Sequence, residues 1–369
     1  FRTMTKKINF GAGPAKIPEA VMQRAHDEFL LYGNTGISIL EMSHRSADFT
    51  AIIKEAERLL RDEMSIPNEF EVLFMQGGGT GQFAAVPLNI SRGHKSADYA
   101  VTGAWSDKAA KEAEKFLDVH KVFTPTKPYT TIPDYSTWNR NKDAAYLYYC
   151  ANETVHGIEF HTHPETYDNV PLVTDISSNF LSRPFDFTNH GIVYGGTQKN
   201  LGAAGLTVAI VRKDLIGHEV RHTPSILSYK EMHENSSVYN TPSVYGIYIT
   251  KLVLEWIRDT GGVNKVFDNN KEKSRLIYDV IDSSSGFYSG TVDPTYRSHM
   301  NIPFRIGGGK DELEAQFLKG AVERGMIGLK GHRSVGGIRA SLYNAITMSE
   351  TITLAEWMKE FREHHETSD

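Results

Sequence analysis

Hydrophobic and polar positions along this chain follow two alternating periods, which predicts strands and helices in turn. Apolar runs rich in β-branched and aromatic residues have the length of strands. These runs lie at 70–75, 99–102, 144–150, 172–176, 191–194 and 206–211. Several are apolar at successive positions, as strands are when both of their faces are covered. The pattern therefore predicts an α/β fold with a largely parallel sheet.

Apolar residues at helical spacing predict helices before and between these strands. Pro18 precedes a helix with one apolar face, and Gly33 is placed to end it. Asp48 is placed to cap a second helix. Longer helical patterns follow at 106–117 and 243–258.

The pattern changes near residue 260. Helices expected beyond it alternate with short strands, a mixture typical of a smaller α+β unit. These helices lie at 271–281, 311–324 and 354–364, and the strands at 301–306 and 337–342. We therefore expect two domains, as suits a chain of 369 residues. The large domain covers 17–260, and the small domain is formed by 1–16 and 261–369.

Composition narrows the class of protein. The formal net charge is −5 and Lys and Arg form no long basic tract, so nucleic acid is not expected as a partner. No apolar run approaches the roughly 20 residues that span a bilayer, so a membrane is not expected either. The single cysteine, Cys150, cannot form an internal disulfide, which favours a reducing, cytoplasmic location.

Lys199 is the first candidate for chemistry. It follows a β-branched and aromatic run that ends in Gly195-Gly196, and small residues come after it. A lysine at such a strand end can aim its amine at a bound carbonyl, as a Schiff-base lysine must. An ordinary solvent-facing loop lysine is the alternative, and this segment alone does not decide between them.

A glycine-rich segment at 76–81 follows an expected strand and opens a helix. Its glycines allow the backbone to approach an anion closely, and a helix N-terminus supplies free N–H groups. A phosphate group is one candidate ligand, and a tight strand-to-helix turn is the alternative. The P-loop pattern Gly-x-x-x-x-Gly-Lys-Ser/Thr is absent, and Gln82 stands where a dinucleotide fingerprint needs its third glycine.

These segments resemble those of a known family when they are taken together. The segments 76–79, 151–154, 173–175, 196–199 and 331–339 occur in the order and at the spacings of the phosphoserine aminotransferases. The likeness runs from about Asn9 to the C-terminal helix. It implies a fold-type I pyridoxal-phosphate enzyme whose large domain holds a mostly parallel seven-stranded sheet. It also implies a homodimer with active sites at the subunit interface.

The resemblance assigns a site for pyridoxal 5′-phosphate. Lys199 would bind the cofactor covalently, Asp175 would pair with its ring nitrogen, and Trp105 would stack on its ring. Thr154 would bind the ring hydroxyl. Without the resemblance, Asp175 could equally be a turn cap, and Trp105 an ordinary core residue.

The cofactor phosphate is assigned to residues of both subunits. Gly79, Thr80 and Gln198 would hold it from one subunit, and Asn240 and Thr241 from the other. Bacterial members commonly carry Arg at the position of Thr80. Thr cannot replace that charge, so the chain departs from the bacterial pattern at Thr80.

Two His-Arg pairs and one further arginine are assigned to the substrate. Arg339 would bind the α-carboxylate of the amino acid. His332 and Arg333, with His44 and Arg45 of the other subunit, would surround its distal phosphate. Arginine suits such anions because it binds them bidentately, although most arginines are simply solvated. No metal site is expected.

The implied reaction transfers an amino group between L-glutamate and 3-phosphohydroxypyruvate. Its products are O-phospho-L-serine and 2-oxoglutarate, formed by a ping-pong mechanism in serine biosynthesis.

Three other classes of protein are alternatives. A cysteine desulfurase would need a mobile cysteine, whereas Cys150 lies in an expected buried strand. An alanine–glyoxylate aminotransferase would not need two His-Arg pairs. A catalytically silent cofactor-binding protein would be expected to have lost the lysine or the aspartate.

Overall fold

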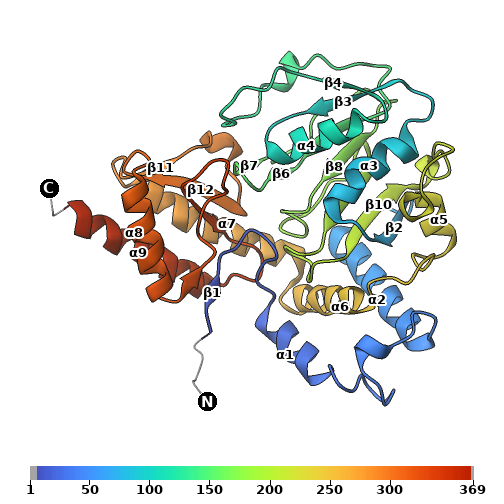
Figure 1. Ribbon diagram of the computed structural model, residues 1–369, viewed down its shortest axis with the longest axis horizontal. Coiled ribbons are helices and arrows are strands. Elements are labelled where there is room, and N and C mark those ends of the chain that lie inside the picture. The colour runs from blue at the N-terminus through green and yellow to red at the C-terminus, as the bar shows by residue number, and fades with distance from the viewer. Residues whose placement is uncertain (1–5, 367–369) are drawn as a thin grey trace.

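The computed structural model describes residues 6–366, and its larger part, at the right of Figure 1, is built around a seven-stranded sheet. Its strands are β2 (Phe70–Met75), β3 (Ser96–Ala100), β4 (Asp118–Lys121), β5 (Leu147–Cys150), β8 (Leu172–Asp175), β9 (His190–Gly196) and β10 (Thr207–Arg212). Their order is β2-β10-β9-β8-β5-β3-β4. β10 is antiparallel to both of its neighbours, and the other neighbouring pairs are parallel. The mostly parallel sheet of the prediction is confirmed.

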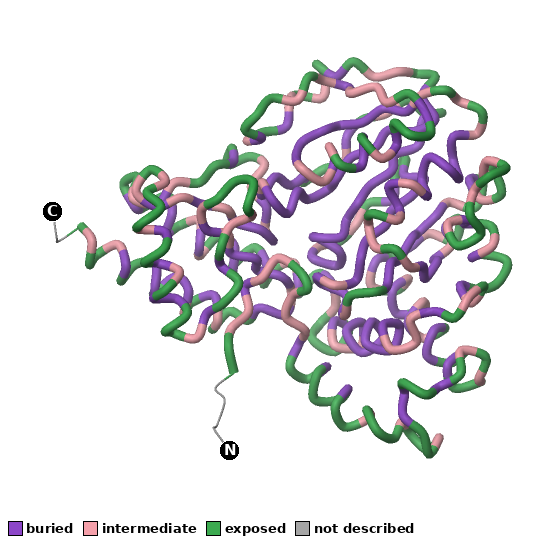
Figure 2. The backbone as a smooth tube through the Cα atoms, in the orientation of Figure 1, coloured by how far each residue is buried: buried purple, intermediate pink, exposed green. Residues whose placement is uncertain are grey.

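The middle strands of this sheet are buried along their whole length (Figure 2). Both of their faces are therefore covered, as their continuous apolar runs predict. The buried tyrosines among them keep hydrogen-bond partners, since the hydroxyl groups of Tyr148 and Tyr194 lie 2.9 Å apart. β4 was not expected from the sequence, because it is a short edge strand with a single apolar residue, Val119, and none of its residues is fully buried.

Helices pack around the large sheet (Figure 1). They are α1 (Glu19–Asp27), α2 (Ala47–Met64), α3 (Gly78–Ile90), α4 (Ala104–Ala113), α5 (Tyr229–Glu234) and α6 (Val244–Asp259). α3 and α4 pack together and contact the strands, while α2 lies along α6. Within residues 6–366, no helix combines the length and the apolar character needed to cross a bilayer.

Two expected features of the first helices are wrong. α1 ends at Asp27, well before Gly33, because the apolar residues after it do not continue a buried face. Leu30, for example, is 75% exposed. The N-cap of α2 is Ser46, whose hydroxyl accepts a hydrogen bond from the first turn. Asp48 instead lies within that turn, where a carboxylate is favoured by the helix dipole.

A second group of elements follows α6. It contains α7 (Gly262–Asp282), β11 (Tyr288–Gly290), β12 (Asn301–Ile306), α8 (Asp311–Glu323), β13 (Met326–Ile327), β14 (Ile338–Ser341) and α9 (Met348–Glu366). β11, β12 and β14 form an antiparallel sheet in that order. Near the N-terminus, β1 (Ile8–Asn9) pairs with β13 and so joins this group.

The hydrophobic core forms two clusters. One cluster is built on the large sheet, and the other contains Phe10 together with side chains between Ile277 and Phe361. The first cluster also takes in Val263 and Val266 at the start of α7, so the two cores do not separate at residue 260, and the domain limits of 17–260 stay a prediction. Residues 1–5 and 367–369 of the expected small domain lie outside the described residues.

The carboxyl ends of parallel strands meet at one edge of the large sheet. β2 shares the direction of β9, because both are antiparallel to β10. The segments that follow these strands therefore converge at this edge. They are the glycine-rich segment after β2, the start of α4 after β3, the hairpin of β6 (Asn152–Glu153) and β7 (Ile158–Glu159) after β5, and the turn after β9. In open α/β sheets, ligands bind at this edge.

Candidate functional site

A cavity of about 320 Å³ lies at this edge of the sheet. Most of the residues that the sequence assigns to cofactor or substrate line it: Gly79, Thr80, Trp105, Thr154, Asp175, Gln198, Lys199, His332 and Arg339. All but the last two lie at the carboxyl end of a strand of the large sheet or in a segment that follows one. His332 and Arg339 come from the second group of elements, so the cavity lies where the two groups meet.

Lys199 lies inside this cavity rather than in solvent, with 8% of its surface exposed. Its Nζ donates a hydrogen bond of 2.8 Å to Thr154 Oγ1 and lies 5.7 Å from the centre of the Trp105 ring. Gly13 lies against its stem, where a Cβ would come within 3.2 Å of Lys199 Cγ. Burial lowers the pKa of the Lys199 amine, and the Asp175 carboxylate opposes that shift. A lowered pKa leaves more of the amine neutral, as a nucleophile or base requires.

Asp175 is a buried carboxylate held in a fixed position at the end of β8. The Ser177 backbone N–H donates a hydrogen bond of 2.8 Å to its Oδ1. Burial raises the pKa of Asp175, and the hydrogen bonds from Ser177 oppose this shift. A Cβ at Gly79 would come within 3.4 Å of Asp175 Oδ2. The glycine therefore keeps the space beside the carboxylate open.

Trp105 forms another wall of the cavity from the first turn of α4. Its indole is half-buried, and the indole N–H has no hydrogen-bond partner among the described residues. The ring thus offers a flat apolar surface near the Lys199 amine. Such a surface suits an aromatic ligand.

The N-terminus of α3 supplies an anion site. Gly77 is its N-cap with φ 98°, and Gly78 follows with φ 62°, a conformation that favours glycine. The first N–H groups of a helix have no partner within it, and the helix dipole favours a negative charge there. Because Gly79 and Thr80 line the cavity, these N–H groups lie at its wall.

Cationic side chains of the second group of elements also line the cavity. Arg339 Nη1 donates a hydrogen bond of 3.3 Å to Thr154 O, while its Nε is buried without a partner among the described residues. Burial lowers the pKa of Arg339. Burial, and then the charges of Arg339 and Arg333, lowers the pKa of His332. The two arginines thus disfavour a positive charge on His332, and an anionic ligand bound here would stabilise these positive charges.

The remaining assigned residues do not line this cavity. Arg333 is exposed beside His332, and the pair His44-Arg45 lies just before α2. Asn240 Nδ2 donates to Gln76 Oε1 at 3.1 Å, and Gln76 Nε2 donates to Thr241 O at 3.2 Å. These bonds hold the Asn240-Thr241 segment beside the glycine-rich segment. The prediction gives both this segment and the His44-Arg45 pair to a second subunit, which a single chain does not test.

Some residues at the cavity received no role from the sequence. Asn152 and Ser177 line it, and Glu153 accepts a hydrogen bond from the Trp105 backbone N–H. Asn152 and Glu153 stand in the same motif as Thr154, so the signal was present in the sequence. What was missing was the partner of each side chain, which only the fold supplies.

Comparison with known proteins agrees with this geometry. The family model of the class-V aminotransferases matches residues 8–354. A probable phosphoserine aminotransferase of Caenorhabditis elegans is 61% identical over 366 residues, which cover 98% of this chain and 99% of the relative. The phosphoserine aminotransferase of Drosophila melanogaster is 52% identical over 356 residues, which cover 96% of this chain and 98% of the relative.

Solved structures point to the same family. The phosphoserine aminotransferase of Bacillus circulans subsp. alkalophilus superposes with a TM-score of 0.94 at 44% identity, covering 98% of this chain and 99% of its own. The pyridoxal-phosphate-bound enzyme of Trichomonas vaginalis gives 0.93 at 38% identity, covering 96% of this chain and 100% of its own. An alanine–glyoxylate aminotransferase of Nostoc sp., at 16% identity and a TM-score of 0.76, shares the fold alone. The chain belongs to the phosphoserine aminotransferase family of the class-V aminotransferases.

Proposed function

We propose that this chain transfers the amino group between L-glutamate and 3-phosphohydroxypyruvate, giving O-phospho-L-serine and 2-oxoglutarate in serine biosynthesis. The observation that carries the proposal is the buried Lys199 amine, which shares one cavity with Asp175 and Arg339. Membership of the phosphoserine aminotransferase family supports the choice of substrates.

The cofactor is pyridoxal 5′-phosphate, and the residues at the cavity fit it. A phosphate group suits the free N–H groups at the start of α3, and an aromatic ring suits the Trp105 indole. Gly79 leaves open the space that a side chain would fill beside Asp175. The donor set of one lysine, one carboxylate and one threonine hydroxyl matches the polar groups of the cofactor ring.

The side chains divide the chemistry among them. Pyridoxal 5′-phosphate supplies an electron sink when it is bound. Lys199 would hold it through Nζ and then, once released, would take the proton from the substrate α-carbon and pass it to C4′ of the cofactor. The lowered pKa of Lys199 favours both roles, because a protonated amine is neither nucleophile nor base. Asp175 would keep a positive charge at the ring nitrogen, since its carboxylate is buried and held by Ser177.

The cationic side of the cavity would bind and orient the substrate. Arg339 would pair with the α-carboxylate, and His332 and Arg333 would bind the distal anion. Glutamate and phosphoserine both carry a distal anion on a short side chain. The two amino acids can therefore use the same cavity in turn, as a ping-pong reaction requires.

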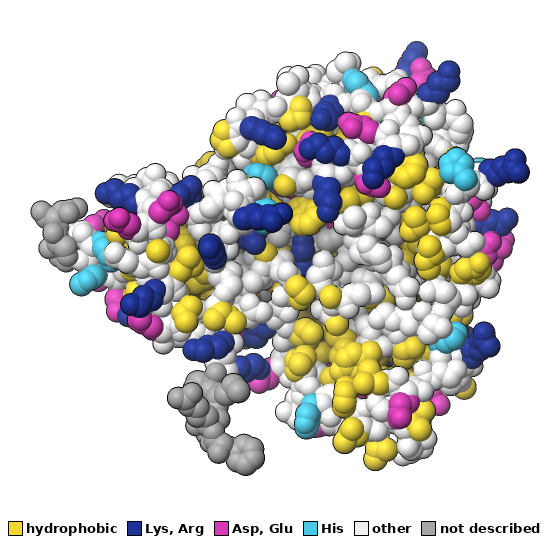
Figure 3. Space-filling view, viewed as in Figure 1, with side chains coloured by type: hydrophobic (Ala, Val, Ile, Leu, Met, Phe, Trp, Pro, Cys, Tyr) yellow, Lys and Arg dark blue, Asp and Glu magenta, His cyan; other side chains and the backbone are white. Residues whose placement is uncertain are grey.

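A second copy of the chain would complete this site with His44, Arg45, Asn240 and Thr241. None of the four lines the cavity of its own chain. Large apolar side chains gather on α1 and the segment after it, where hydrophobic surface is visible at the lower end of Figure 3. Exposed apolar surface of this kind is typical of an interface between subunits. These side chains are Met22, Phe29, Leu30, Leu31, Ile37 and Leu40.

The test of the reaction is a comparison of substrates and variants. The purified chain with pyridoxal 5′-phosphate should turn over phosphohydroxypyruvate and glutamate, and Lys199→Ala should lose this turnover. Preference for glyoxylate over phosphohydroxypyruvate would overturn the choice of substrates. Full turnover by Lys199→Ala would overturn the role of the lysine.

The shared site can be tested by mixing two inactive variants. Chains with Lys199→Ala and chains with Arg45→Ala are each expected to be inactive as homodimers. A hybrid dimer would hold one intact site, built from Lys199 of one chain and Arg45 of the other. An equal mixture should therefore recover about a quarter of the wild-type activity, because half of randomly formed dimers are hybrids. No recovery, or a monomer at micromolar concentration, would contradict the homodimer.

We also infer a cytoplasmic location. The one cysteine, Cys150, is buried and unpaired, as suits a reducing compartment. Fractionation of cells that express the tagged full-length protein tests this, and recovery of the protein in an organelle would refute it.

A further inference from the structure

The hairpin of β6 and β7 carries two carboxylates that are completely buried, Glu153 and Glu159. A buried carboxylate is costly unless several donors satisfy it. The two carboxylates accept hydrogen bonds on opposite sides of the hairpin, and only Glu153 contacts the wall of the cavity.

Glu153 binds the first turn of α4. Its carboxylate accepts hydrogen bonds from the backbone N–H groups of Trp105 and Ser106, each at 2.9 Å, and from Ser106 Oγ at 2.6 Å. These N–H groups are among those that a helix N-terminus leaves without a partner. A carboxylate there also meets the positive end of the helix dipole. Glu153 therefore acts as an N-terminal cap for α4 that is supplied from a distant part of the chain.

The turn that leads into α4 is built around this carboxylate. Ser106 Oγ accepts hydrogen bonds from the N–H groups of Thr102 and Gly103, at 3.0 and 3.1 Å, and so links the turn to Glu153. A Cβ at Gly103 would lie 2.5 Å from both Cγ and Oε2 of Glu153. The backbone of Gly103 is extended, with φ −175°, so its conformation does not require glycine. Glycine is required because Glu153 occupies the space that a Cβ at this position would fill.

The direction of the Trp105 ring depends on this turn. No polar contact fixes the indole itself, because its Nε1 has no partner among the described residues. The ring nevertheless lies 5.7 Å from Lys199 Nζ, on the wall of the cavity. The indole packs against the large hydrophobic cluster and its ring centre lies 5.5 Å from Lys108 Nζ, and Glu153 holds the backbone from which it projects at the Trp105 N–H.

We propose that Glu153 is a positioning residue whose carboxylate holds the first turn of α4, so that the Trp105 indole faces the cofactor ring. This inference rests on the proposed function, because it assumes that pyridoxal 5′-phosphate occupies the cavity. Glu153 and Thr154 are neighbours in the chain, and Thr154 contacts Lys199 directly. One short segment thus places both the wall of the cavity and the hydroxyl partner of the lysine.

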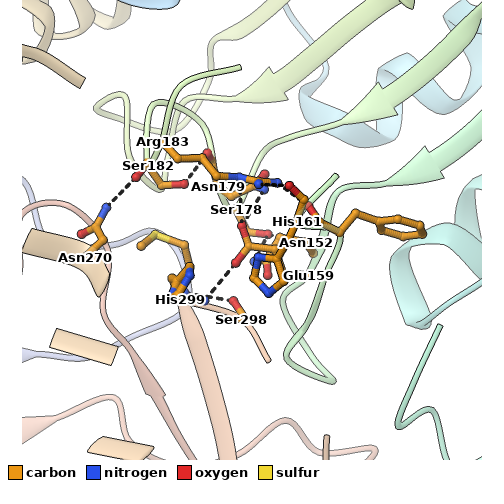
Figure 4. Close-up of polar contacts among 12 residues, drawn as sticks. Asn152, Glu159, His161, Ser178, Asn179, Ser182, Arg183, Asn270, Ser298 and His299 are labelled. Atoms are coloured by element: carbon orange, nitrogen blue, oxygen red, sulfur yellow. Dashed lines mark hydrogen bonds and ion pairs between the residues drawn. The ribbon is translucent and has the colours of Figure 1, made fainter. Parts of the chain in front are cut away.

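Glu159 provides a matched control from the same hairpin. Figure 4 shows its carboxylate among polar groups that do not belong to α4. It accepts hydrogen bonds from the His299 backbone N–H at 2.9 Å and from Asn179 Nδ2 at 3.2 Å, and Arg183 Nε lies 3.4 Å away. Glu159→Gln therefore perturbs an equally buried carboxylate without touching the turn that holds Trp105.

The experiment measures the affinity of the full-length chain for pyridoxal 5′-phosphate. Glu153→Gln keeps the shape of the side chain but turns an amide N–H₂ toward N–H donors. We expect it to weaken cofactor binding about tenfold, the size of a lost helix cap. Glu159→Gln should change this affinity by less than about twofold. Equal losses in the two variants would overturn the proposal.

A double-mutant cycle separates positioning of the ring from general damage. In a Trp105→Phe background, Glu153→Gln should weaken cofactor binding much less than it does in the wild type, because the two residues act together. Equal effects in both backgrounds would refute the proposal. If Glu153→Gln does not fold, Ser106→Ala removes one donor to the same carboxylate and is tested in the same cycle. Failure of the wild type to bind the cofactor would instead refute the proposed function.

Discussion

We expect Arg339 to lower the free energy of unfolding of the protein while it binds the carboxylate of the substrate. Its guanidinium has one hydrogen bond, of 3.3 Å to Thr154 O, and a buried Nε without a partner among the described residues. Burial lowers its pKa, so the protonated form is disfavoured in the free protein. Arg339→Met keeps the length and much of the apolar volume of the side chain but removes the charge.

The two expected effects of Arg339→Met have opposite signs. Loss of a desolvated ion pair with the substrate carboxylate costs about 2–5 kcal/mol, so kcat/KM for glutamate should fall about 30- to 5,000-fold. Loss of the hydrogen bond to Thr154 costs about 1 kcal/mol of folding free energy. Removal of a partly buried, unpaired charge returns about 1–4 kcal/mol. The free energy of unfolding should therefore stay the same or rise by up to about 3 kcal/mol.

Arg305 is the matched control for stability. It lies on β12, next to the strand of Arg339, and its Nε donates a hydrogen bond of 2.6 Å to Glu314 Oε1. The Glu314 side chain is only 7% exposed. Arg305→Met leaves this carboxylate without its guanidinium, which should cost about 2–3 kcal/mol of stability, somewhat less than for a fully buried pair.

The assay combines urea unfolding of the cofactor-free chain with steady-state kinetics of the chain that carries pyridoxal 5′-phosphate. Arg339→Met should lose more activity than Arg305→Met and less stability. If Arg339→Met is destabilised as much as Arg305→Met, then Arg339 is a structural residue. If it retains wild-type kcat/KM, then Arg339 does not bind the substrate carboxylate. Either result would refute the reasoning.

Further predictions concern the lysines and the turn before α4. Thr154→Val removes the 2.8 Å hydrogen bond that favours the charged Lys199, so the pKa of Lys199 should fall further, as measured by the pH dependence of its acylation. Gly103→Ala should push against Glu153, lower stability by about 1–3 kcal/mol and weaken cofactor binding in a fluorescence titration. Burial lowers the pKa of Lys273 to about 7. The unfolded chain keeps this proton to about pH 10, so urea unfolding from pH 7 to 10 should show the wild type gaining stability over Lys273→Met, at up to about 1.4 kcal/mol per pH unit.

The sequence predicted most accurately those strands whose limits follow from their own run of apolar residues. β2 and β12 have the limits expected from their apolar runs. Asp175 could be placed at the end of its strand for the same reason. The start of α7 was missed, because Gly261-Gly262 indicated only the end of the preceding helix. Gly261, with φ 108°, is in fact the N-cap of α7 as well.

Much of the site was predictable only through the resemblance to a family. The glycine-rich segment and Lys199 each had an ordinary alternative that local sequence could not exclude. The fold supports the functional interpretation of both, because the segments converge at the edge of the sheet where ligands bind in open α/β folds. Glu153 shows the limit of this reasoning, since its partners lie on α4, which comes earlier in the chain. No spacing pattern connects the two segments.

The place of Arg339 in the cavity depends on buried amide contacts between the two groups of elements. Asn152 Nδ2, at the wall of the cavity, donates a hydrogen bond of 2.8 Å to Asn301 Oδ1 on β12. Asn301 Nδ2 donates to Tyr343 Oη at 3.2 Å, and the Tyr343 hydroxyl donates to Ala12 O at 2.8 Å, which returns to the cavity wall. Since β12 pairs with the strand that carries Arg339, these bonds link that strand to the wall of the cavity that holds Asn152. The strand alone would only point the arginine toward the cavity, and the amide contacts hold it there.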